Sequence, residues 1–263
     1  MIPVSDQIYS LKNRTVWVIG GAGYLGQPTV LLLHSLGATV VCCDVNGKAA
    51  AFVEKAGIQQ GLTGVDIDMS SEEAIKMFVA EQINKGGVPY GLVDLTYAST
   101  AKKMEELSGA DFNKVNQAIT HTFLLAREVG TQMAIRGEGS IVLFSSMYGN
   151  VAPYPAVYEG LNMNVNPVEY GAGKAAIIQL TKYLSVHWGL RNIRCNCISP
   201  GPFPSPAVQE QHPEFIKRLS EKVPLGRVGR NYEISGVVAF LLADASSFIT
   251  GQNLLVDGGW TAW

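Results

Sequence analysis

A tyrosine and a lysine four positions apart form the most reactive pair in this sequence. Tyr170 and Lys174 lie in the stretch VEYGAGKAAIIQLTKYLS, which we predict to be helical. Residues four apart share one face of a helix, so both side chains would point the same way. A neighbouring ammonium stabilises a phenolate, and the tyrosine could then act as an acid and a base. Because such pairs also occur by chance in many helices, the surrounding elements have to decide its meaning.

A glycine-rich turn near the N-terminus points to a dinucleotide. The residues IGGAGYLGQP follow the apolar run TVWVIGG and open a helical segment. Gly20, Gly23 and Gly26 would permit the tight turn, the approach of a pyrophosphate to the backbone, and close packing of helix on strand. The N-terminus of the following helix would also favour the phosphates electrostatically.

Two aspartates follow the next two predicted strands. Asp44 ends ATVVCCD, and no arginine comes directly after it. A carboxylate at this place accepts hydrogen bonds from ribose hydroxyls and repels a 2′-phosphate, so we expect NAD, with NADP the less favoured cofactor. Asp68, predicted to end the third strand, is a candidate partner for the adenine amine or, equally, a turn residue.

The elements that would position these residues alternate along the chain. We predict strands over residues 15–21, 38–44, 64–68, 90–97, 139–146, 193–201 and 251–259. We predict helices over residues 28–37, 70–87, 111–137, 170–189 and 232–244. This alternation indicates a single α/β domain over residues 1–263, with a Rossmann-like doubly wound parallel sheet and helices on both faces.

Composition and charge argue against several other classes of protein. The chain has 263 residues, a net charge of −2 and no basic block, so nucleic acid is not an expected partner. No apolar run is long enough for a membrane span, and the start MIPVSDQIYSLKNR lacks the pattern of a signal peptide. We therefore expect a cytoplasmic protein. The four cysteines form two close pairs, Cys42/Cys43 and Cys195/Cys197, inside strand-like apolar runs. This placement indicates buried thiols and not a metal site.

In their order and context, these motifs resemble the short-chain dehydrogenase/reductase family over nearly the whole chain. The resemblance rests on the glycine turn, Asp44, GSIVLFSS, the Tyr170-x-x-x-Lys174 pair, IRCNCISPGPF and ITGQNLLVDGG. It implies an NAD(P)-dependent oxidoreductase that interconverts a secondary alcohol and a ketone, and that forms a homotetramer or homodimer. It also implies Tyr170 as the acid/base, Lys174 as its partner, and Ser146 as the group that holds the substrate oxygen.

The same resemblance supplies the wider candidate site. The expected cofactor-binding residues are Gly20, Gly23, Tyr24, Leu25, Gly26, Asp44, Asp68, Met69, Thr96, Tyr170, Lys174, Pro200, Gly201 and Phe203. The expected substrate-binding residues are Ser146, Tyr148, Tyr158 and Tyr170. No metal ligand is expected.

Four departures from the family pattern bear on activity. Ile19 stands where a threonine usually ties the glycine turn to the neighbouring strand, and the glycine spacing is closer to a branch that modifies nucleotide sugars. Residues 94–97 replace an Asn-Asn-Ala-Gly segment. The asparagine of the family's proton relay falls at Ala118, and Asn116 is out of register. The relay is therefore expected to be rerouted or absent.

The segment between Ser146 and Tyr170 is longer than the family pattern predicts. Residues 150–169 are rich in aromatic and amide side chains, and we predict that they form a wall of the substrate pocket. Residues 201–230 are predicted to form a substrate loop or lid. With the ending DGGWTAW, the insertion resembles family members linked to bacterial surface carbohydrates, so a sugar or another polyhydroxylated molecule is the preferred substrate. A surface excursion or a subunit contact is the alternative role.

Two other functions stay open at this point. An epimerase or dehydratase with tightly bound NAD would fit the glycine spacing, and it would turn over without added cofactor. A catalytically silent NAD-binding or scaffold protein would fit the departures from the family pattern. The intact set of Ser146, Tyr170 and Lys174 argues against this last alternative.

Overall fold

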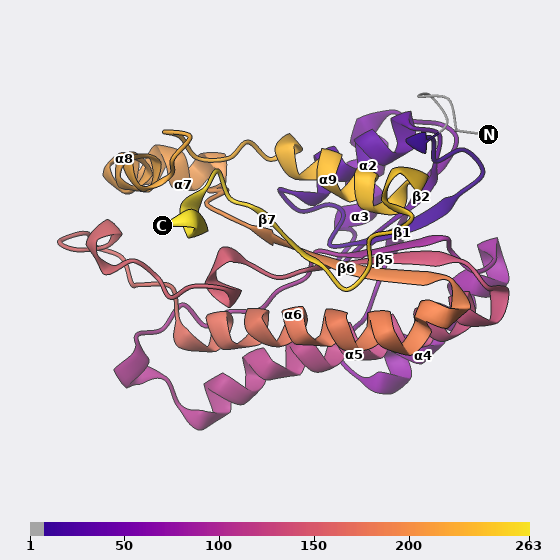
Figure 1. Ribbon diagram of the computed structural model, residues 1–263, viewed down its shortest axis with the longest axis horizontal. Coiled ribbons are helices and arrows are strands. Elements are labelled where there is room, and N and C mark those ends of the chain that lie inside the picture. Colours follow the sequence, from indigo (N-terminus) through magenta and orange to yellow (C-terminus); the bar gives the residue numbers. More distant parts are fainter. Residues whose placement is uncertain (1–7) are drawn as a thin grey trace.

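A seven-stranded parallel sheet forms the centre of the computed structural model, which describes residues 8–263 (Figure 1). The first seven residues, part of the N-terminal stretch considered above, lie outside this description. The strands are β1 (Thr15–Ile19), β2 (Thr39–Asp44), β3 (Leu62–Asp66), β4 (Gly91–Asp94), β5 (Gly139–Phe144), β6 (Ile193–Pro200) and β7 (Asn253–Val256). Their spatial order is β3-β2-β1-β4-β5-β6-β7, and all neighbours are parallel. The winding reverses between β1 and β4, which confirms the predicted doubly wound fold.

Helices cover both faces of this sheet (Figure 1). One layer contains α2 (Gly26–Ser35), α3 (Lys48–Ala56) and α9 (Tyr232–Leu242). The other layer contains α4 (Glu72–Gly86), α5 (Gly109–Arg136) and α6 (Val168–Trp188). Two further helices, α7 (Pro206–Gln211) and α8 (Pro213–Lys222), lie beyond the carboxyl ends of the strands. No helix within residues 8–263 is long and apolar enough to cross a membrane.

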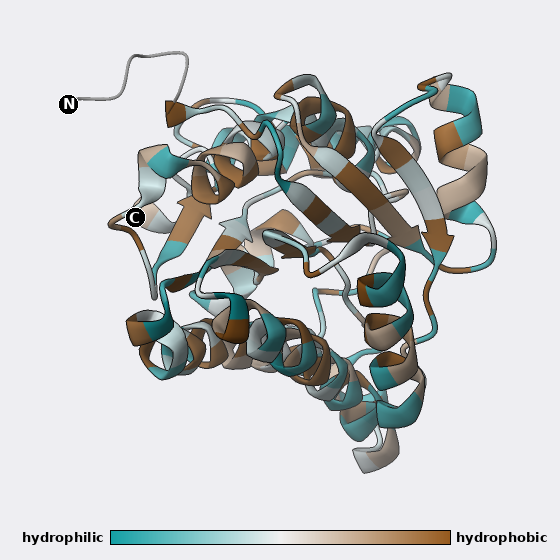
Figure 2. Cartoon of the chain, turned by 90° about the vertical axis from the view of Figure 1, so that its right-hand side faces the viewer, coloured by the Kyte–Doolittle hydropathy of each residue, from teal (hydrophilic) through white to brown (hydrophobic). Residues whose placement is uncertain are grey.

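Successive side chains of a strand point into opposite layers. On β4, Leu92 packs toward α4–α6, whereas Val93 packs toward α2, α3 and α9. Because both faces are covered, the strands are apolar along much of their length, as the brown colour in Figure 2 shows. The same alternation places Asp94, the last residue of β4, on the face of Leu92 and toward α5.

All but one of the predicted strands run past the observed carboxyl end, by one to three residues, and side-chain turns follow two of these ends. β3 ends at Asp66, paired with Asp44 of β2, so Asp68 lies two residues beyond the strand. There the Asp68 carboxylate accepts the amide of Ser70 at 2.8 Å and turns the chain. β4 likewise ends at Asp94, whose carboxylate accepts the amide of the residue two positions later.

Three helices were not predicted from the sequence. α3 is nine residues long and lies between Gly47 and Gly57, both of which have a left-handed backbone with φ of 72° and 67°. A glycine directly after a short apolar-periodic segment is a signal that could have revealed this helix. α7 and α8 lie inside the predicted substrate loop, and each has a proline at its start.

Candidate active site

The turn between β1 and α2 requires glycine because backbone packs directly against backbone. A Cβ atom added to Gly26 would lie 2.4 Å from the carbonyl oxygen of Gly20 and 2.7 Å from the backbone of Gly21. Gly20 has a left-handed φ of 75°. Gly21, which was not among the predicted site residues, packs against Cys42, whose Sγ would lie 2.8 Å from an added Cβ. The result is a compact turn at the carboxyl end of β1, in which glycines stand where backbone meets backbone.

Backbone and carboxylate hydrogen bonds attach this turn to β2. The amide of Gly20 donates to the carbonyl oxygen of Cys43 at 2.8 Å. The Oδ2 atom of Asp44 accepts the amide of Ala22 at 3.1 Å. These bonds connect the turn to the neighbouring strand where the family uses a threonine, and they free Ile19 to be a fully buried core residue.

Other predicted cofactor-binding residues lie at the start of α2 and just beyond β3. Tyr24 and Leu25 lead into α2, and the carbonyl oxygen of Tyr24 accepts a hydrogen bond from Asn231 at 3.1 Å. Asp68 is exposed, and its hydrogen bonds with Ser70 hold the pKa of its carboxyl below the usual value. Met69 packs against the core beside α4 and α5.

The three predicted catalytic side chains meet where β5 ends and α6 begins. Ser146 follows β5, and its hydroxyl accepts the amide of Tyr148 at 3.2 Å. Tyr170 lies in the first turn of α6, and Lys174 lies one turn later. Burial raises the pKa of Tyr170, and its hydrogen bond with Ser146 lowers that pKa. Ser146 and Tyr170 are therefore close neighbours at the end of β5, as a substrate-oxygen site requires.

Lys174 is buried and is held by main-chain carbonyl groups. Its Nζ donates to the carbonyl oxygen of Phe144 at 2.7 Å and to that of Thr96 at 3.3 Å. The Nζ atom lies 5.8 Å from the centre of the Tyr170 ring. Burial lowers the pKa of Lys174 to about 8, so the ammonium is present below this pH and is lost above it.

A cavity of about 20 Å³ separates these residues from α5. Among the side chains that line it are Thr96, Tyr97, Ala118, Thr122, Tyr170 and Lys174. Ala118 thus faces Lys174 at the position of the family's asparagine. Asn116 instead borders a separate surface hollow on α5, together with Gln117 and Thr120. The structure therefore does not bring Asn116 to the lysine.

Tyr97 partly covers the candidate catalytic tyrosine. Its ring meets the ring of Tyr170 edge to face, with 6.4 Å between the ring centres. Tyr97 is 71% exposed, so it forms an outer wall of the cavity and does not fill the core. The tyrosine that replaces the family's glycine narrows the approach to Tyr170.

The insertion packs into a small apolar core with α8 and the C-terminal residues. The buried members of this core are Met147, Val157, Tyr158, Leu219, Val223 and Trp260. Within it, the hydroxyl groups of Tyr148 and Tyr158 are hydrogen-bonded at 2.8 Å. Burial raises the pKa of both phenols, so both stay neutral hydrogen-bonding groups.

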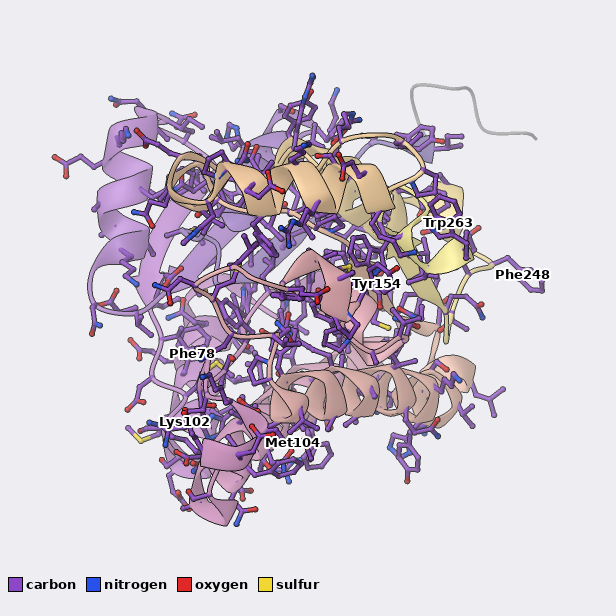
Figure 3. The ribbon with its side chains drawn as sticks, turned by 90° about the vertical axis from the view of Figure 1, so that its left-hand side faces the viewer. Phe78, Lys102, Met104, Tyr154, Phe248 and Trp263 are labelled. Atoms are coloured by element: carbon purple, nitrogen blue, oxygen red, sulfur yellow. The ribbon has the colours of Figure 1, made fainter. Side chains whose placement is uncertain are left out.

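A lysine on α8 joins the insertion to the end of the chain. The Nζ atom of Lys222 lies 5.5 Å from the ring centre of Tyr154, 5.4 Å from that of Trp260 and 4.9 Å from that of Trp263. Figure 3 shows Tyr154 and Trp263 at this end of the molecule. Cation–π attraction of this kind holds Tyr154 of the insertion against α8.

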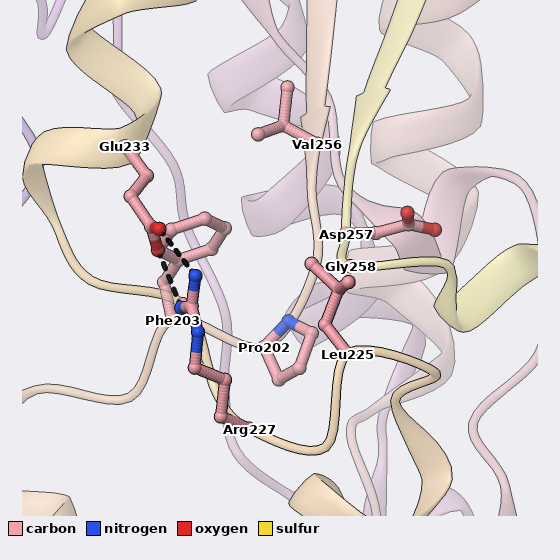
Figure 4. Close-up of a pocket in the computed structure, with 9 residues that line it drawn as sticks. Pro202, Phe203, Leu225, Arg227, Glu233, Val256, Asp257 and Gly258 are labelled. Carbon is pink, nitrogen blue, oxygen red and sulfur yellow. Dashed lines mark hydrogen bonds and ion pairs between the residues drawn. The ribbon is translucent and has the colours of Figure 1, made fainter.

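Phe203, predicted to lie near the nicotinamide, borders a different hollow. Pro200 ends β6, and a Cβ added to Gly201 would lie 2.5 Å from the Cα of Asp257. Phe203 follows in a hollow of about 130 Å³, where Arg227 is paired with Glu233 at 2.6 Å (Figure 4). The structure does not bring Phe203 into the cavity that contains Tyr170.

Two buried carboxylates near the site were not singled out as site residues. Asp94 is 2% exposed and accepts hydrogen bonds from the hydroxyls of Thr96 and Thr122 at 2.6 and 2.8 Å. Glu169 is fully buried beside Tyr170 and accepts the hydroxyl of Thr100 at 2.7 Å. For Asp94, the available signal was a charged residue inside the otherwise apolar run YGLVDLTY.

Comparisons with known proteins agree with this geometry. The family model described as enoyl-(acyl carrier protein) reductase matches residues 22–261. A short-chain dehydrogenase/reductase of Aspergillus versicolor is 32% identical, with 98% of this chain and 90% of that protein covered. An NAD-dependent glycerol dehydrogenase of Listeria innocua is 30% identical, with 97% of each chain covered.

A solved structure shows the same fold with a cofactor. It is a short-chain dehydrogenase of Leptospira borgpetersenii with bound NAD⁺, which superposes with a TM-score of 0.84 at 29% identity and with 99% of this chain and 97% of that chain covered. The chain is thus matched over nearly its whole length, both in sequence and in fold. This chain belongs to the short-chain dehydrogenase/reductase family and is an oxidoreductase that acts on CH–OH groups.

Proposed function

We propose that this protein is an NAD-dependent dehydrogenase that interconverts a secondary alcohol and a ketone on a polyhydroxylated small molecule. The observation that carries this proposal is the meeting of Ser146, Tyr170 and Lys174 at the carboxyl end of the sheet, on the side where the glycine turn also lies. Membership in a family of oxidoreductases supports the interconversion of an alcohol and a ketone. The three side chains are suited to the proton transfer that this reaction needs.

Different residues of this chain would bind the cofactor, hold the substrate and transfer the proton. The compact glycine turn and Asp44 would hold the dinucleotide, which when bound accepts a hydride from the alcohol carbon. Ser146 would hold the alcohol oxygen by a hydrogen bond. Tyr170 would take the proton from that oxygen, and the ammonium of Lys174 would stabilise the phenolate. In the ketone-reducing direction Tyr170 would return the proton.

The choice of NAD over NADP rests on Asp44. Its carboxylate lies at the end of β2 and is fixed by the amides of Ala22 and Val45 at 3.1 and 2.9 Å. A carboxylate held in this way disfavours a second negative charge on the ribose. The NAD-dependent relative from Listeria innocua supports the same preference.

Asp44→Ser is expected to raise the NADP/NAD ratio of kcat/KM by about tenfold or more, because it removes the charge that repels a 2′-phosphate. Steady-state kinetics with both cofactors would measure the ratio. Asp66→Ser is the matched control, since Asp66 pairs with Asp44 across the sheet and its carboxylate faces Gly47 instead of the glycine turn. An equal change in both variants would contradict the specific role of Asp44.

The preference for a polyhydroxylated substrate rests on the insertion. Tyr158 of the insertion pairs its hydroxyl with that of Tyr148, and Tyr148 lies near enough to Tyr170 for a charge on Tyr170 to raise the pKa of Tyr148. Neutral hydroxyl groups that both donate and accept suit a ligand rich in hydroxyls. The similarity to a glycerol dehydrogenase is consistent with such a ligand.

The test is hydride transfer to NAD⁺ and NADP⁺ across a panel of polyols, sugars and hydroxy acids, followed by the absorbance of the reduced cofactor. We expect turnover with at least one polyhydroxylated alcohol, and faster turnover with NAD⁺. Oxidation of apolar alcohols only would contradict the proposed substrate class. Turnover without added cofactor would favour an epimerase or dehydratase. The family assignment sets aside a catalytically silent protein.

We also propose that the protein works as a homodimer or homotetramer. Apolar side chains are exposed toward the carboxyl-terminal ends of α5 and α6 and just beyond α6, namely Ile135, Tyr183, Val186 and Leu190. Packing against a second copy would remove them from water.

A further inference from the structure

A carboxylate is buried behind the proposed catalytic lysine. Asp94 is the last residue of β4, and 2% of it is exposed. Its Oδ1 accepts the amide and the hydroxyl of Thr96 at 2.9 and 2.6 Å, and its Oδ2 accepts the hydroxyl of Thr122 at 2.8 Å. All three donors are neutral, and none of the ion pairs found in residues 8–263 includes Asp94. A buried negative charge with only neutral donors calls for a positive partner nearby.

Thr96 connects this carboxylate to Lys174. The Nζ of Lys174 donates to the carbonyl oxygen of Thr96 at 3.3 Å, while the amide and hydroxyl of the same residue donate to Asp94. The cavity of about 20 Å³ is lined by Thr96, Thr122 and Lys174 as well, and it is large enough for one water molecule. The cation and the anion are therefore linked through a single residue, and both charged side chains are buried.

We propose that Asp94 is the buried counter-ion of Lys174, a positioning residue that keeps the lysine protonated beside Tyr170. This inference rests on the proposed function, because it assigns Asp94 a part in the work of Lys174. It also accounts for a departure from the family pattern at residues 94–97. There the carboxylate of Asp94 stands in place of the first asparagine of the Asn-Asn-Ala-Gly segment.

The charges around Lys174 support this assignment. Burial lowers the pKa of the lysine to about 8, and the attraction of Asp94 acts in the opposite direction. Tyr170 on α6 is neutral near pH 7 because burial raises its pKa. Cys197 on β6 is neutral as well, since burial raises the pKa of its thiol to about 11. From α5, the lysine is faced by Ala118, Ile119 and Thr122, which carry no charge. Asp94 is the carboxylate whose charge acts on the lysine, whereas the other buried carboxylate near the site, Glu169, accepts hydrogen bonds from Thr100.

The loss of this charge should lower the pH at which Lys174 loses its proton. In Asp94→Asn the side chain keeps its shape and a hydrogen-bond acceptor, but the carboxylate charge is gone. In Thr122→Val the charge stays, and one hydrogen bond to Asp94 is lost. The full-length, cofactor-free protein would carry ¹³C at the lysine ε-carbons, and Lys174→Arg would assign the signal of Lys174.

We expect the Lys174 signal of the wild type to titrate near pH 8, and that of Asp94→Asn at clearly lower pH. Thr122→Val should titrate close to the wild type. An unchanged midpoint in Asp94→Asn would overturn the proposal, as would an equal shift in Thr122→Val. If Asp94→Asn does not fold, Asp94→Ser supplies a second neutral side chain with the same expected result.

The pH profile of alcohol oxidation gives a second readout that a merely structural role would not move. Oxidation needs the phenolate of Tyr170, so kcat rises with pH, and a charged Lys174 lowers the midpoint of this rise. In Asp94→Asn the lysine is neutral over more of the pH range, so the midpoint of kcat should move to higher pH. Below that midpoint we expect kcat to fall about tenfold. A structural defect alone would lower kcat at every pH. It would leave unchanged both the midpoint of the Lys174 titration and the midpoint of the rise of kcat with pH.

Failure of this inference and failure of the proposed function give different results. The lysine titration needs no substrate and no turnover, so it can confirm or overturn the role of Asp94 even if no tested alcohol is oxidised. If the wild type is active and the Lys174 midpoint is the same in the wild type and in Asp94→Asn, the proposed function is retained. The role of Asp94 as a counter-ion is then overturned.

Discussion

Tyr170→Phe is expected to lower kcat for alcohol oxidation by about 10²–10⁴-fold, the usual contribution of a positioned acid/base. The substitution removes one oxygen atom and keeps the ring that packs against Tyr97 and faces Lys174. KM and the dissociation constant of the cofactor should change far less than kcat. Steady-state kinetics at several pH values would measure the effect, and isothermal calorimetry would measure cofactor binding.

A second tyrosine on the same helix provides the matched control. Tyr183 is 66% exposed and stacks on His187, away from the cavity. Tyr183→Phe removes the same atom from α6 and should leave kcat unchanged. If Tyr170→Phe retained wild-type kcat, the proton would have to leave by another group, and the proposed role of Tyr170 would be wrong.

Local patterns in the sequence were sufficient for the fold and for the pair on α6. The strands are buried on both faces, so their apolar runs can be read directly, and a spacing of four fixes the common face of Tyr170 and Lys174. The strand ends were harder to predict. Single side chains near these ends, such as Asp68 just beyond β3 and Asp94 at the end of β4, turn the chain by accepting the amide two residues later.

The surroundings of Lys174 could not be predicted from the sequence. Thr122 reaches Asp94 because α5 packs against the end of β4, and no local pattern reports that contact. The sequence predicted a charged lysine beside a tyrosine. The structure shows that burial works against this charge, which makes the nearby carboxylate important. Such shifts arise from tertiary packing alone.

Gly26→Ala is expected to weaken binding of NAD by about ten- to a hundredfold and to lower the free energy of unfolding by about 1–3 kcal/mol. The added Cβ would lie 2.4 Å from the carbonyl oxygen of Gly20 and 2.7 Å from the backbone of Gly21. These neighbours are backbone atoms, so no side chain can rotate away, and the turn itself has to open. The turn is also attached to β2 through Gly20, so opening would disturb that bond.

Gly86→Ala is the control for this substitution. Gly86 is the last residue of α4, and an added Cβ there would meet no atom within 4 Å. Alanine favours a helix more than glycine does, so this variant should be as stable as the wild type or up to about 1 kcal/mol more stable. Calorimetric titration with NAD and urea unfolding would measure both effects. Wild-type affinity in Gly26→Ala would show that the turn tolerates a side chain, and the cofactor would then have to be bound elsewhere.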